Sequence, residues 1–380
     1  MYEPSYWEME SVFKHIDICI IGSGIVGLNA AIHLKTSTPS MNVVVVERSF
    51  LPYGASTRNA GFACFGSMTE LMDDLEKETE EEVFSRVEMR WKGLNKLRKL
   101  IGDGALDYEP HGGYEVFTGT DGNSYDKCSE KIAYFNKLMK SITGIEETYA
   151  CADEYIPGFG FSGVSHMILN RQEGQINSGK MMHTLVDIAH QKGVCIINGL
   201  SIHEIQNREK EVELFCENGF TFKARRLLVA NNGFAKKLLP DIAVEPARAQ
   251  VLITRPIEKL KIKGSFHYEK GYYYFRNVGN RILFGGGRNL DFEGETTTAF
   301  GTTGQIQERL EELLTTVIIP DTRYEVDMRW SGIMGIGSTK STILKKVNGN
   351  IFCAVRMGGM GVAIGSLVGE QGAEMVLQSL

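Results

Sequence analysis

Three glycines near the start of the chain have the spacing of a phosphate-binding turn. Gly22, Gly24 and Gly27 stand in the stretch GSGIVG, and Glu47 comes twenty residues after Gly27. Glycines at these positions allow a tight turn, a close approach of backbone N–H groups to a pyrophosphate, and close packing of a helix on a strand. A carboxylate at the later position can accept hydrogen bonds from ribose hydroxyls and would repel the 2′-phosphate of NADP. The spacing therefore predicts a site for a dinucleotide other than NADP.

A strand, a helix and a second strand are needed to position these residues, and the sequence predicts all three. The apolar run 16–21 is typical of a buried parallel strand, apolar residues in 28–34 recur at helical spacing, and 41–47 is a second buried strand. The helix would begin beside the glycines, with Ile25 and Val26 in its first turn. Its unpaired N–H groups and the positive end of its dipole would then face the phosphates.

Length and charge limit the classes of protein to which the chain can belong. It has 380 residues, of which 43% are hydrophobic, enough for two domains with cores of their own. The formal net charge is −6, and no block of basic residues interrupts the sequence. Nucleic acid is therefore a poor candidate partner.

Cysteine and histidine spacing argues against a metal site or a disulfide framework. The seven cysteines form no CxxC pair, and the eight histidines form no HxxxH pair. An odd, scattered set of cysteines suits a reducing compartment. The first residues lack the basic and apolar regions of a signal peptide, and the apolar stretch 351–369 contains Arg356 and several glycines, which favours a strand, a turn and a helix over a membrane span. We expect a soluble cytoplasmic protein without a membrane span.

The rest of the chain alternates helical and β-rich segments. Helices are predicted over 69–100, 177–193 and 305–317, and a β-rich block lies between the last two. No linker or internal repeat is visible. The nucleotide-binding pattern therefore lacks a continuous domain of its own, and a second domain is expected to interrupt it.

Four further stretches, taken together, resemble a known family. They are GASTRNAGFACFG (54–66), LLVANNGF (227–234), MRWSGIMGIGS (328–338) and NIFCAVRMGGMGVAIGS (350–366). In order and spacing they are similar to the FAD-dependent D-amino-acid oxidase (DAO) family, which includes glycine and sarcosine oxidases. The motifs SYW, RNAG and FRNVGNRILFGGG look most like the γ-glutamylputrescine oxidase branch. The resemblance implies that the dinucleotide is FAD.

The resemblance also implies an α/β fold of the glutathione-reductase-like FAD type. A Rossmann-like FAD-binding domain would be interrupted by a substrate domain with a large mixed or antiparallel β-sheet. The expected FAD-binding segments are 1–90, 151–243 and 325–380, and the expected substrate-binding segments are 91–150 and 244–324.

Residues that match the family motifs are expected to hold FAD. The glycine turn would bind the pyrophosphate, Glu47 the adenosine ribose, and the loop from Ser56 to Gly61 would cover the phosphates and the flavin ring. A second glycine turn, in GGMGVAIG, opens another helix whose N-terminus would meet the pyrimidine side of the ring. The full expected set is Gly22, Gly24, Ile25, Val26, Gly27, Glu47, Arg48, Ser56, Thr57, Arg58, Asn59, Ala60, Gly61, Ala230, Asn231, Met357, Gly358, Gly359, Met360 and Gly361.

Two departures from the family pattern indicate that FAD is not covalently attached. Relatives that attach flavin through histidine carry it where this chain has Asn59, and relatives that use cysteine place it near SGIMG, where this chain has none. Cys64 is near the flavin loop but is more typical of a small core residue.

The family oxidises C–N bonds of small-molecule amines or amino acids, with oxygen or an electron carrier as acceptor. Hydride passes from the carbon beside the nitrogen to flavin N5, and the imine then hydrolyses. No side-chain acid or base is required for this step, so none is assigned. In the strand GYYYFR, alternation places Tyr272 and Tyr274 on one face and Tyr273 on the other. By resemblance Tyr273 would face the substrate, although plain sheet packing is an equal alternative, and Trp330 is a further candidate.

Met334 bears on the kind of substrate. In D-amino-acid and glycine oxidases the corresponding block ends in an arginine that clamps the substrate carboxylate. The chain has Gly332-Ile333-Met334 instead, so it lacks at this position the planar guanidinium that binds a carboxylate through two hydrogen bonds. Either another cation reads a carboxylate or the reacting carbon carries none, and we favour an amine or a larger N-substituted substrate. The candidate cations are Arg276, Arg288, Arg329 and Lys340.

Two other functions stay open at this point. The chain could be the flavin subunit of an electron-transfer dehydrogenase assembly, or a relative that modifies tRNA with FAD. The formal net charge of −6 argues against a tRNA-modifying function, because RNA is itself negatively charged.

Overall fold

A mostly parallel sheet carries the first glycine turn. The computed structural model describes residues 3–380, so residues 1–2, which the expected FAD-binding domain includes, lie outside it. Five neighbouring strands of this sheet pair in parallel. In spatial order the sheet contains β17 (Ile343–Asn348), β18 (Ile351–Val355), β11 (Thr221–Val229), β1 (Ile16–Ile21), β2 (Val43–Glu47) and β8 (Cys195–Asn198), and β10 (Val212–Cys216) and β9 (Ile202–Asn207) extend from β11.

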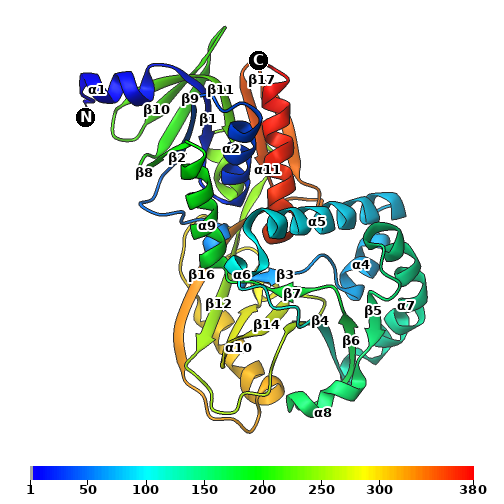
Figure 1. The fold of residues 1–380 in the computed structure, drawn as a ribbon. Coiled ribbons are helices and arrows are strands. Elements are labelled where there is room, and N and C mark those ends of the chain that lie inside the picture. The colour runs from blue at the N-terminus through cyan, green and yellow to red at the C-terminus, as the bar shows by residue number, and fades with distance from the viewer. Residues whose placement is uncertain (1–2) are drawn as a thin grey trace.

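The second sheet is almost entirely antiparallel and lies in the other half of the molecule, at the bottom of Figure 1. Its one parallel pair joins β13 and β4. In spatial order it contains β16 (Val326–Ile336), β12 (Glu245–Thr254), β15 (Arg281–Gly286), β14 (Tyr273–Val278), β13 (Ser265–Tyr268), β4 (Gly113–Thr118), β6 (Val164–Asn170) and β5 (Tyr149–Cys151). A short pair, β3 (Phe62–Ala63) and β7 (Gly174–Gln175), stands apart. The expected α/β class with a large mixed sheet is confirmed.

The helices cover the sheets and fill the space between them. In Figure 1, α2 and α11 stand side by side against the first sheet, and α5 crosses between the two halves. Their apolar residues share one core with the inner face of the parallel strands. The helices are α1 (Tyr6–Glu8), α2 (Ile25–Ser37), α3 (Ala55–Arg58), α4 (Met68–Leu75), α5 (Glu80–Ile101), α6 (Asp103–Leu106), α7 (Gly122–Thr143), α8 (Ile156–Phe159), α9 (Ser178–Gln191), α10 (Gly304–Leu313) and α11 (Gly361–Leu377).

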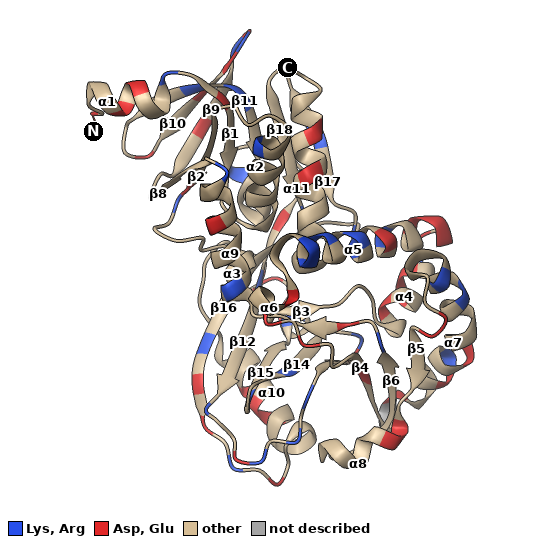
Figure 2. Ribbon diagram, in the orientation of Figure 1, with Lys and Arg blue, Asp and Glu red and all other residues tan. Residues whose placement is uncertain are grey.

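The predicted helix 69–100 is in fact two helices. α4 ends at Leu75, and α5 starts after Thr79, whose hydroxyl accepts a hydrogen bond from the backbone N–H of Glu82. The Glu82 carboxylate accepts the N–H of Thr79 in return, so a capping box starts a new helix. Figure 2 shows acidic residues at the start of α5 and basic residues near its end, which complements the helix dipole.

Strand pairing divides the chain differently from the expected segment boundaries. β6 lies within the expected FAD-binding segment 151–243, yet its register runs antiparallel to β4, from Gly113↔Asn170 onward. β16 lies within the expected segment 325–380 and pairs along its length with β12. These ladders bury backbone hydrogen bonds in the second sheet, so we propose that both strands belong to the substrate-binding unit.

No helix within residues 3–380 combines the length and apolar character that a membrane span requires.

Candidate functional site

A cavity of about 1020 Å³ runs between the two sheets. Its walls come from segments far apart in the sequence: the turn before α2, the end of β2, the loop 54–64, the end of β11, strand β16 and the turn before α11. This volume is at the upper end of the range for small-molecule sites, which suits a dinucleotide together with a small substrate.

The first glycine turn is held by backbone packing that leaves no room for a side chain. Gly22 has φ +106°, and a Cβ built on it would lie 3.0 Å from the carbonyl oxygen of Ala230. A Cβ on Gly27 would overlap the carbonyl oxygen of Gly22. The turn therefore joins β1 to the start of α2 at the cavity, as the spacing predicts, and it packs against Ala230 after β11.

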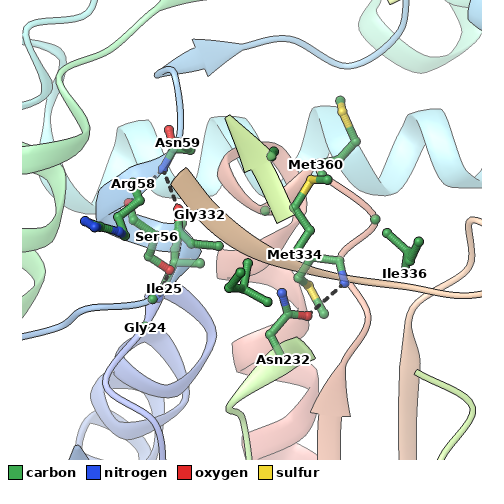
Figure 3. A pocket seen from close by; sticks show the side chains of 18 of the residues that line it. Gly24, Ile25, Ser56, Arg58, Asn59, Asn232, Gly332, Met334, Ile336 and Met360 are labelled. Carbon is green, nitrogen blue, oxygen red and sulfur yellow. Dashed lines mark hydrogen bonds between the residues drawn. The ribbon is translucent and has the colours of Figure 1, made fainter. Parts of the chain in front are cut away.

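The first turn of α2 opens onto the cavity and carries no acidic side chain at its positive end. Gly24 is the N-cap and makes no side-chain cap, and the first turn holds no acidic residue. Figure 3 shows Ser56 beside Gly24 and Ile25, and its hydroxyl accepts the Ile25 N–H at 2.9 Å. The other N–H groups of this turn can receive a phosphate.

Glu47 lies at the carboxyl end of β2 in the wall of the cavity and is 7% exposed. One carboxylate oxygen accepts the Ser23 hydroxyl at 2.9 Å, and the other accepts the Ser49 N–H at 3.1 Å. These bonds fix its direction and leave lone pairs for ligand hydroxyls. Nearby, the Arg48 guanidinium lies 3.7 Å from the ring centre of Phe234, and both residues line the cavity.

The second glycine turn comes from the other end of the chain and meets the same cavity. Residues Met357–Gly361 all line it, and α11 starts there with no acidic residue in its first turn. Asn232 fixes this turn, because its side-chain oxygen accepts the N–H of Arg356 at 3.0 Å and of Met357 at 3.3 Å. Two helix N-termini therefore converge on one ligand site.

The loop after α3 closes the cavity from the side. Arg58 donates from Nε to the carbonyl oxygen of Ser331 at 2.8 Å, and its guanidinium lies over the ring of Tyr53. Asn59 donates to the carbonyl oxygen of Ser56 and receives the hydroxyl of Ser178 at 2.7 Å (Figure 3 shows the first contact). The loop is thus tied to α9 and β16 at once.

Tyr273 does not face the cavity, contrary to the expectation drawn from the resemblance. It is 1% exposed and packs in the core between the second sheet and α10. Its neighbours Tyr272 and Tyr274 line the cavity instead. The alternation of the strand is as expected, and Tyr273 has the plain sheet packing that was the equal alternative to a substrate-facing position.

Two other expected substrate residues serve the loop rather than the cavity wall. Arg276 is buried and donates to the carbonyl oxygens of Ala60 and Ile176. Burial lowers the pKa of its guanidinium to about 10. Trp330 donates its indole N–H to the carbonyl oxygen of Arg58 at 3.1 Å. Neither lines the cavity, so both are positioning residues.

Met334 lies in the cavity wall, as expected. Figure 3 places it between Asn232, Ile336 and Met360. A Cβ on Gly359 would stand 3.5 Å from its sulfur, in ordinary contact. It gives this part of the wall a flexible, apolar surface beside the second glycine turn.

Most of the expected cofactor residues line the cavity. Gly27 and Thr57 do not: Gly27 acts through backbone packing, and the Thr57 hydroxyl donates to the carbonyl oxygen of Pro52 at 2.8 Å. Those that line it are Gly22, Gly24, Ile25, Val26, Glu47, Arg48, Ser56, Arg58, Asn59, Ala60, Gly61, Ala230, Asn231, Met357, Gly358, Gly359, Met360 and Gly361.

Sequence reasoning missed several wall residues, among them Phe62, Asn232 and His267. Asn232 has φ +49°, and asparagine tolerates this left-handed region, so the repeated asparagine in VANNG was a usable signal. Nothing in the local pattern singles out Phe62 or His267, because sheet pairing brings them to the cavity.

Buried carboxyl groups lie behind the cavity wall. Burial raises the pKa of Glu173 to about 8 and that of Glu115 to about 7. Glu173 accepts the N–H groups of Phe65 and Gly66, and its other oxygen is 4.0 Å from Nε2 of His267. Burial lowers the pKa of His267 to about 4, so its ring is neutral at pH 7. By contrast, burial would raise the pKa of Glu70, but Arg90 and Lys340 bring it down to about 2.

The residues present fit FAD. The cavity offers two helix N-termini free of acidic side chains, a glycine turn that a Cβ would fill, and a buried carboxylate at the end of β2. The side-chain oxygen of Asn231 is buried in the wall and has no hydrogen-bond partner within residues 3–380, which marks a polar position for a ligand donor. Within the same residues, no group of His, Cys, Asp and Glu side chains could hold a metal ion.

Comparison with solved structures shows the fold. The chain superposes on L-proline dehydrogenase from P. horikoshii with a TM-score of 0.75 at 16% identity, covering 96% of this chain and 94% of the other. Glycine oxidase from Geobacillus kaustophilus gives a TM-score of 0.75 at 17% identity, with 96% and 95% coverage.

Comparison with sequences reaches the whole chain. Gamma-glutamylputrescine oxidoreductase of Escherichia coli is 23% identical over 379 residues, which is 95% of this chain and 83% of the relative. The bifunctional protein ThiO/ThiG of Synechocystis is 27% identical over 243 residues, but the match spans only 33% of its length and 63% of this chain. The model of the DAO family, described as FAD-dependent oxidoreductase, matches residues 17–375. The chain therefore belongs to the DAO family of FAD-dependent oxidoreductases.

Proposed function

We propose that the protein oxidises the C–N bond of a small-molecule amine or amino acid. The observation that carries this proposal is the continuity of the cavity, which joins the two glycine turns to a chamber walled by Ala249, Val251, Tyr274 and Met334. The relatives with related folds or sequences are named for amines and amino acids, namely gamma-glutamylputrescine, glycine and L-proline.

FAD held by these residues would supply the two-electron oxidant for a C–N bond. The chain itself supplies position and surroundings. Ala249, Val251 and Met334 form an apolar wall that keeps water from the reacting carbon. Burial raises the pKa of Tyr274 to about 12, so its hydroxyl stays protonated and can donate a hydrogen bond to substrate.

The cofactor contacts follow from the cavity wall. Glu47 would hold the adenosine ribose, the backbone at Gly22–Val26 the pyrophosphate, and Met357–Gly361 the flavin ring. We also propose that FAD is held without a covalent bond. Burial raises the pKa of the Cys64 thiol well above its ordinary value, which keeps this cavity residue protonated and unreactive.

An anaerobic spectroscopic screen tests the proposal. The purified holoenzyme is mixed with primary amines, N-alkyl amino acids, D-amino acids and L-amino acids in the absence of oxygen, and the flavin absorbance is followed. We expect at least one compound with an oxidisable C–N bond to bleach the flavin, and 2-hydroxy acids of the same size to leave it oxidised. Acid precipitation of the same sample should release all the flavin as FAD, and flavin left on the polypeptide would contradict the non-covalent attachment.

The electron acceptor is tested by the second half of the cycle. We propose oxygen or a protein carrier in this role. Admitting oxygen to the bleached enzyme separates the two: reoxidation within a turnover time favours an oxidase, and slow reoxidation with rapid reaction towards an artificial carrier favours a dehydrogenase.

A further inference from the structure

Three of the four cations considered as carboxylate readers are already engaged elsewhere. Arg276 donates to backbone carbonyl oxygens beneath the loop 60–61. Arg329 lies outside the cavity and donates to Gln307 and to Glu311, both at 2.7 Å. Lys340 lines the cavity, but its ammonium is neutralised by Glu70 at 3.0 Å and by Asp74 at 2.6 Å.

Arg288 is the exception. It follows β15 directly after Gly287, whose φ of +76° turns the chain, and it lines the cavity beside Tyr272 and Phe292. Its Nε is buried and has no hydrogen-bond partner within residues 3–380. Another of its nitrogens donates to the Thr296 hydroxyl at 3.4 Å, and its guanidinium lies 4.9 Å from the ring centre of Phe292.

The nearest acidic group does not neutralise this arginine. Glu295 influences Arg288 electrostatically, but its carboxylate is bound by the guanidinium of Arg248 at 2.7 and 2.9 Å. Gln250 donates to the same carboxylate at 2.9 Å. Burial lowers the pKa of Arg288, yet a guanidinium stays charged at neutral pH. The buried Nε–H without an acceptor costs free energy, and an anion in the cavity would supply the missing acceptor.

The neighbouring wall cannot take over this role. Val251 stands opposite Gly285 and Ala249 opposite Gly332 across the sheet, and these positions, together with Met334, present no donor from a side chain. The Tyr274 hydroxyl in the same wall can give a carboxylate one hydrogen bond, whereas an arginine guanidinium can give it two parallel ones.

We propose that Arg288 is the anion-binding residue of the substrate chamber, and that the substrate is an amine that carries a carboxylate. The identity of the anion as a substrate group rests on the proposed function. Position 334 on β16 is a methionine and not an arginine. The carboxylate would therefore be bound by Arg288, which follows β15, on the other side of the chamber.

The test uses the FAD-bound protein and two probes of one shape. Benzoate carries the carboxylate, and benzamide is its neutral counterpart. Each is titrated while the flavin absorbance is recorded, so that binding is measured without turnover. The variants are Arg288→Met, Arg288→Lys and, as a matched control outside the cavity, Arg329→Met.

We expect the wild-type protein and Arg329→Met to bind benzoate about 10- to 100-fold more tightly than benzamide, the preference that a hydrogen-bonded charge confers. Arg288→Met should lose this preference while keeping its FAD, and Arg288→Lys should retain only part of it because lysine lacks the fork. Benzoate binding equal in Arg288→Met and wild type, no preference in wild type, or loss of FAD from Arg288→Met would each overturn the proposal. Flavin that no amine bleaches, with benzoate binding still dependent on Arg288, would contradict the proposed oxidation and support the anion site.

Discussion

At the scale of single residues, the site depends on glycines as much as on residues with side chains. Gly27 carries no Cβ because the carbonyl oxygen of Gly22 occupies the place where one would stand. Gly54, by contrast, lines the cavity, and a Cβ there would meet nothing within 4 Å. The two glycines therefore differ in a way that a substitution can expose.

Gly27→Ala is predicted to weaken FAD binding, and Gly54→Ala is predicted to leave it unchanged. The added methyl group must push α2 away from the turn, a distortion that costs about 1–3 kcal/mol. FAD titration of the two apoproteins, followed by fluorescence quenching, measures the difference. Equal affinities would mean that the turn before α2 does not cradle the cofactor.

The limits of sequence reasoning are clearest at Tyr273. Alternation along a strand shows which side chains share a face, but not which face meets the cavity. That choice depends on pairing with β13 and β15 and on α10, which covers one side of the sheet. By contrast, the glycine turn was predictable because its geometry is local.

At the scale of elements, loops are held in place by long-range hydrogen bonds. Arg276 on β14 supports the loop at Ala60 and, at the same time, Ile176, which lies two residues before α9. Burial of an arginine for this purpose is visible only once the strands are paired, so the sequence indicated a substrate contact instead.

Arg276→Lys is predicted to lower thermal stability and to loosen the loop 60–61. Lysine cannot reach both carbonyl oxygens, and each buried acceptor left unpaired costs about 1–3 kcal/mol. Arg329→Lys, which changes an exposed ion pair, is the control and should shift stability by about 0.5 kcal/mol or less. Melting temperatures with and without FAD provide the measurement. If Arg276→Lys melted at the same temperature as the control, Arg276 would not be needed to position the loop.

Glu173, which lies behind the cavity wall between β6 and β7, makes the stability of the folded chain depend on pH. Its pKa is about 8 when folded and near 4.5 in the free side chain, so between these values the folded chain binds one more proton than the unfolded chain. Stability must then fall as pH rises through this window. Glu115 acts in the same direction up to about 7, and His267 in the opposite direction below 6.5.

Glu173→Gln should therefore flatten the fall in melting temperature between about pH 6.5 and 8, because a neutral amide keeps an acceptor for the N–H groups of Phe65 and Gly66 without ionising. Thermal scans across that range for both proteins provide the comparison. An unchanged slope would show that Glu173 already ionises below this window.

At the scale of the whole molecule, the cavity exists only where the two sheets meet. The family and the α/β fold could be predicted because the motifs at 54–66, 328–338 and 350–366 keep their order and local geometry. The pairing of residues 164–170 with β4 could not be predicted, because the apolar pattern of a strand does not specify its partner. Arg288 could not be singled out from the sequence either. Only the structure shows that Arg248 binds the carboxylate of Glu295 and that the Nε of Arg288 has no partner within residues 3–380.

The central claim is that the bound flavin takes two electrons from a C–N bond, and the most direct measurement is the product of one anaerobic turnover. Holoenzyme is mixed with a compound that bleaches it, and the ammonia or free amine released is counted against the flavin reduced. We predict one nitrogen product and one carbonyl product for each FAD bleached. Full bleaching without release of a nitrogen product, or bleaching by a substrate that contains no C–N bond, would contradict the account.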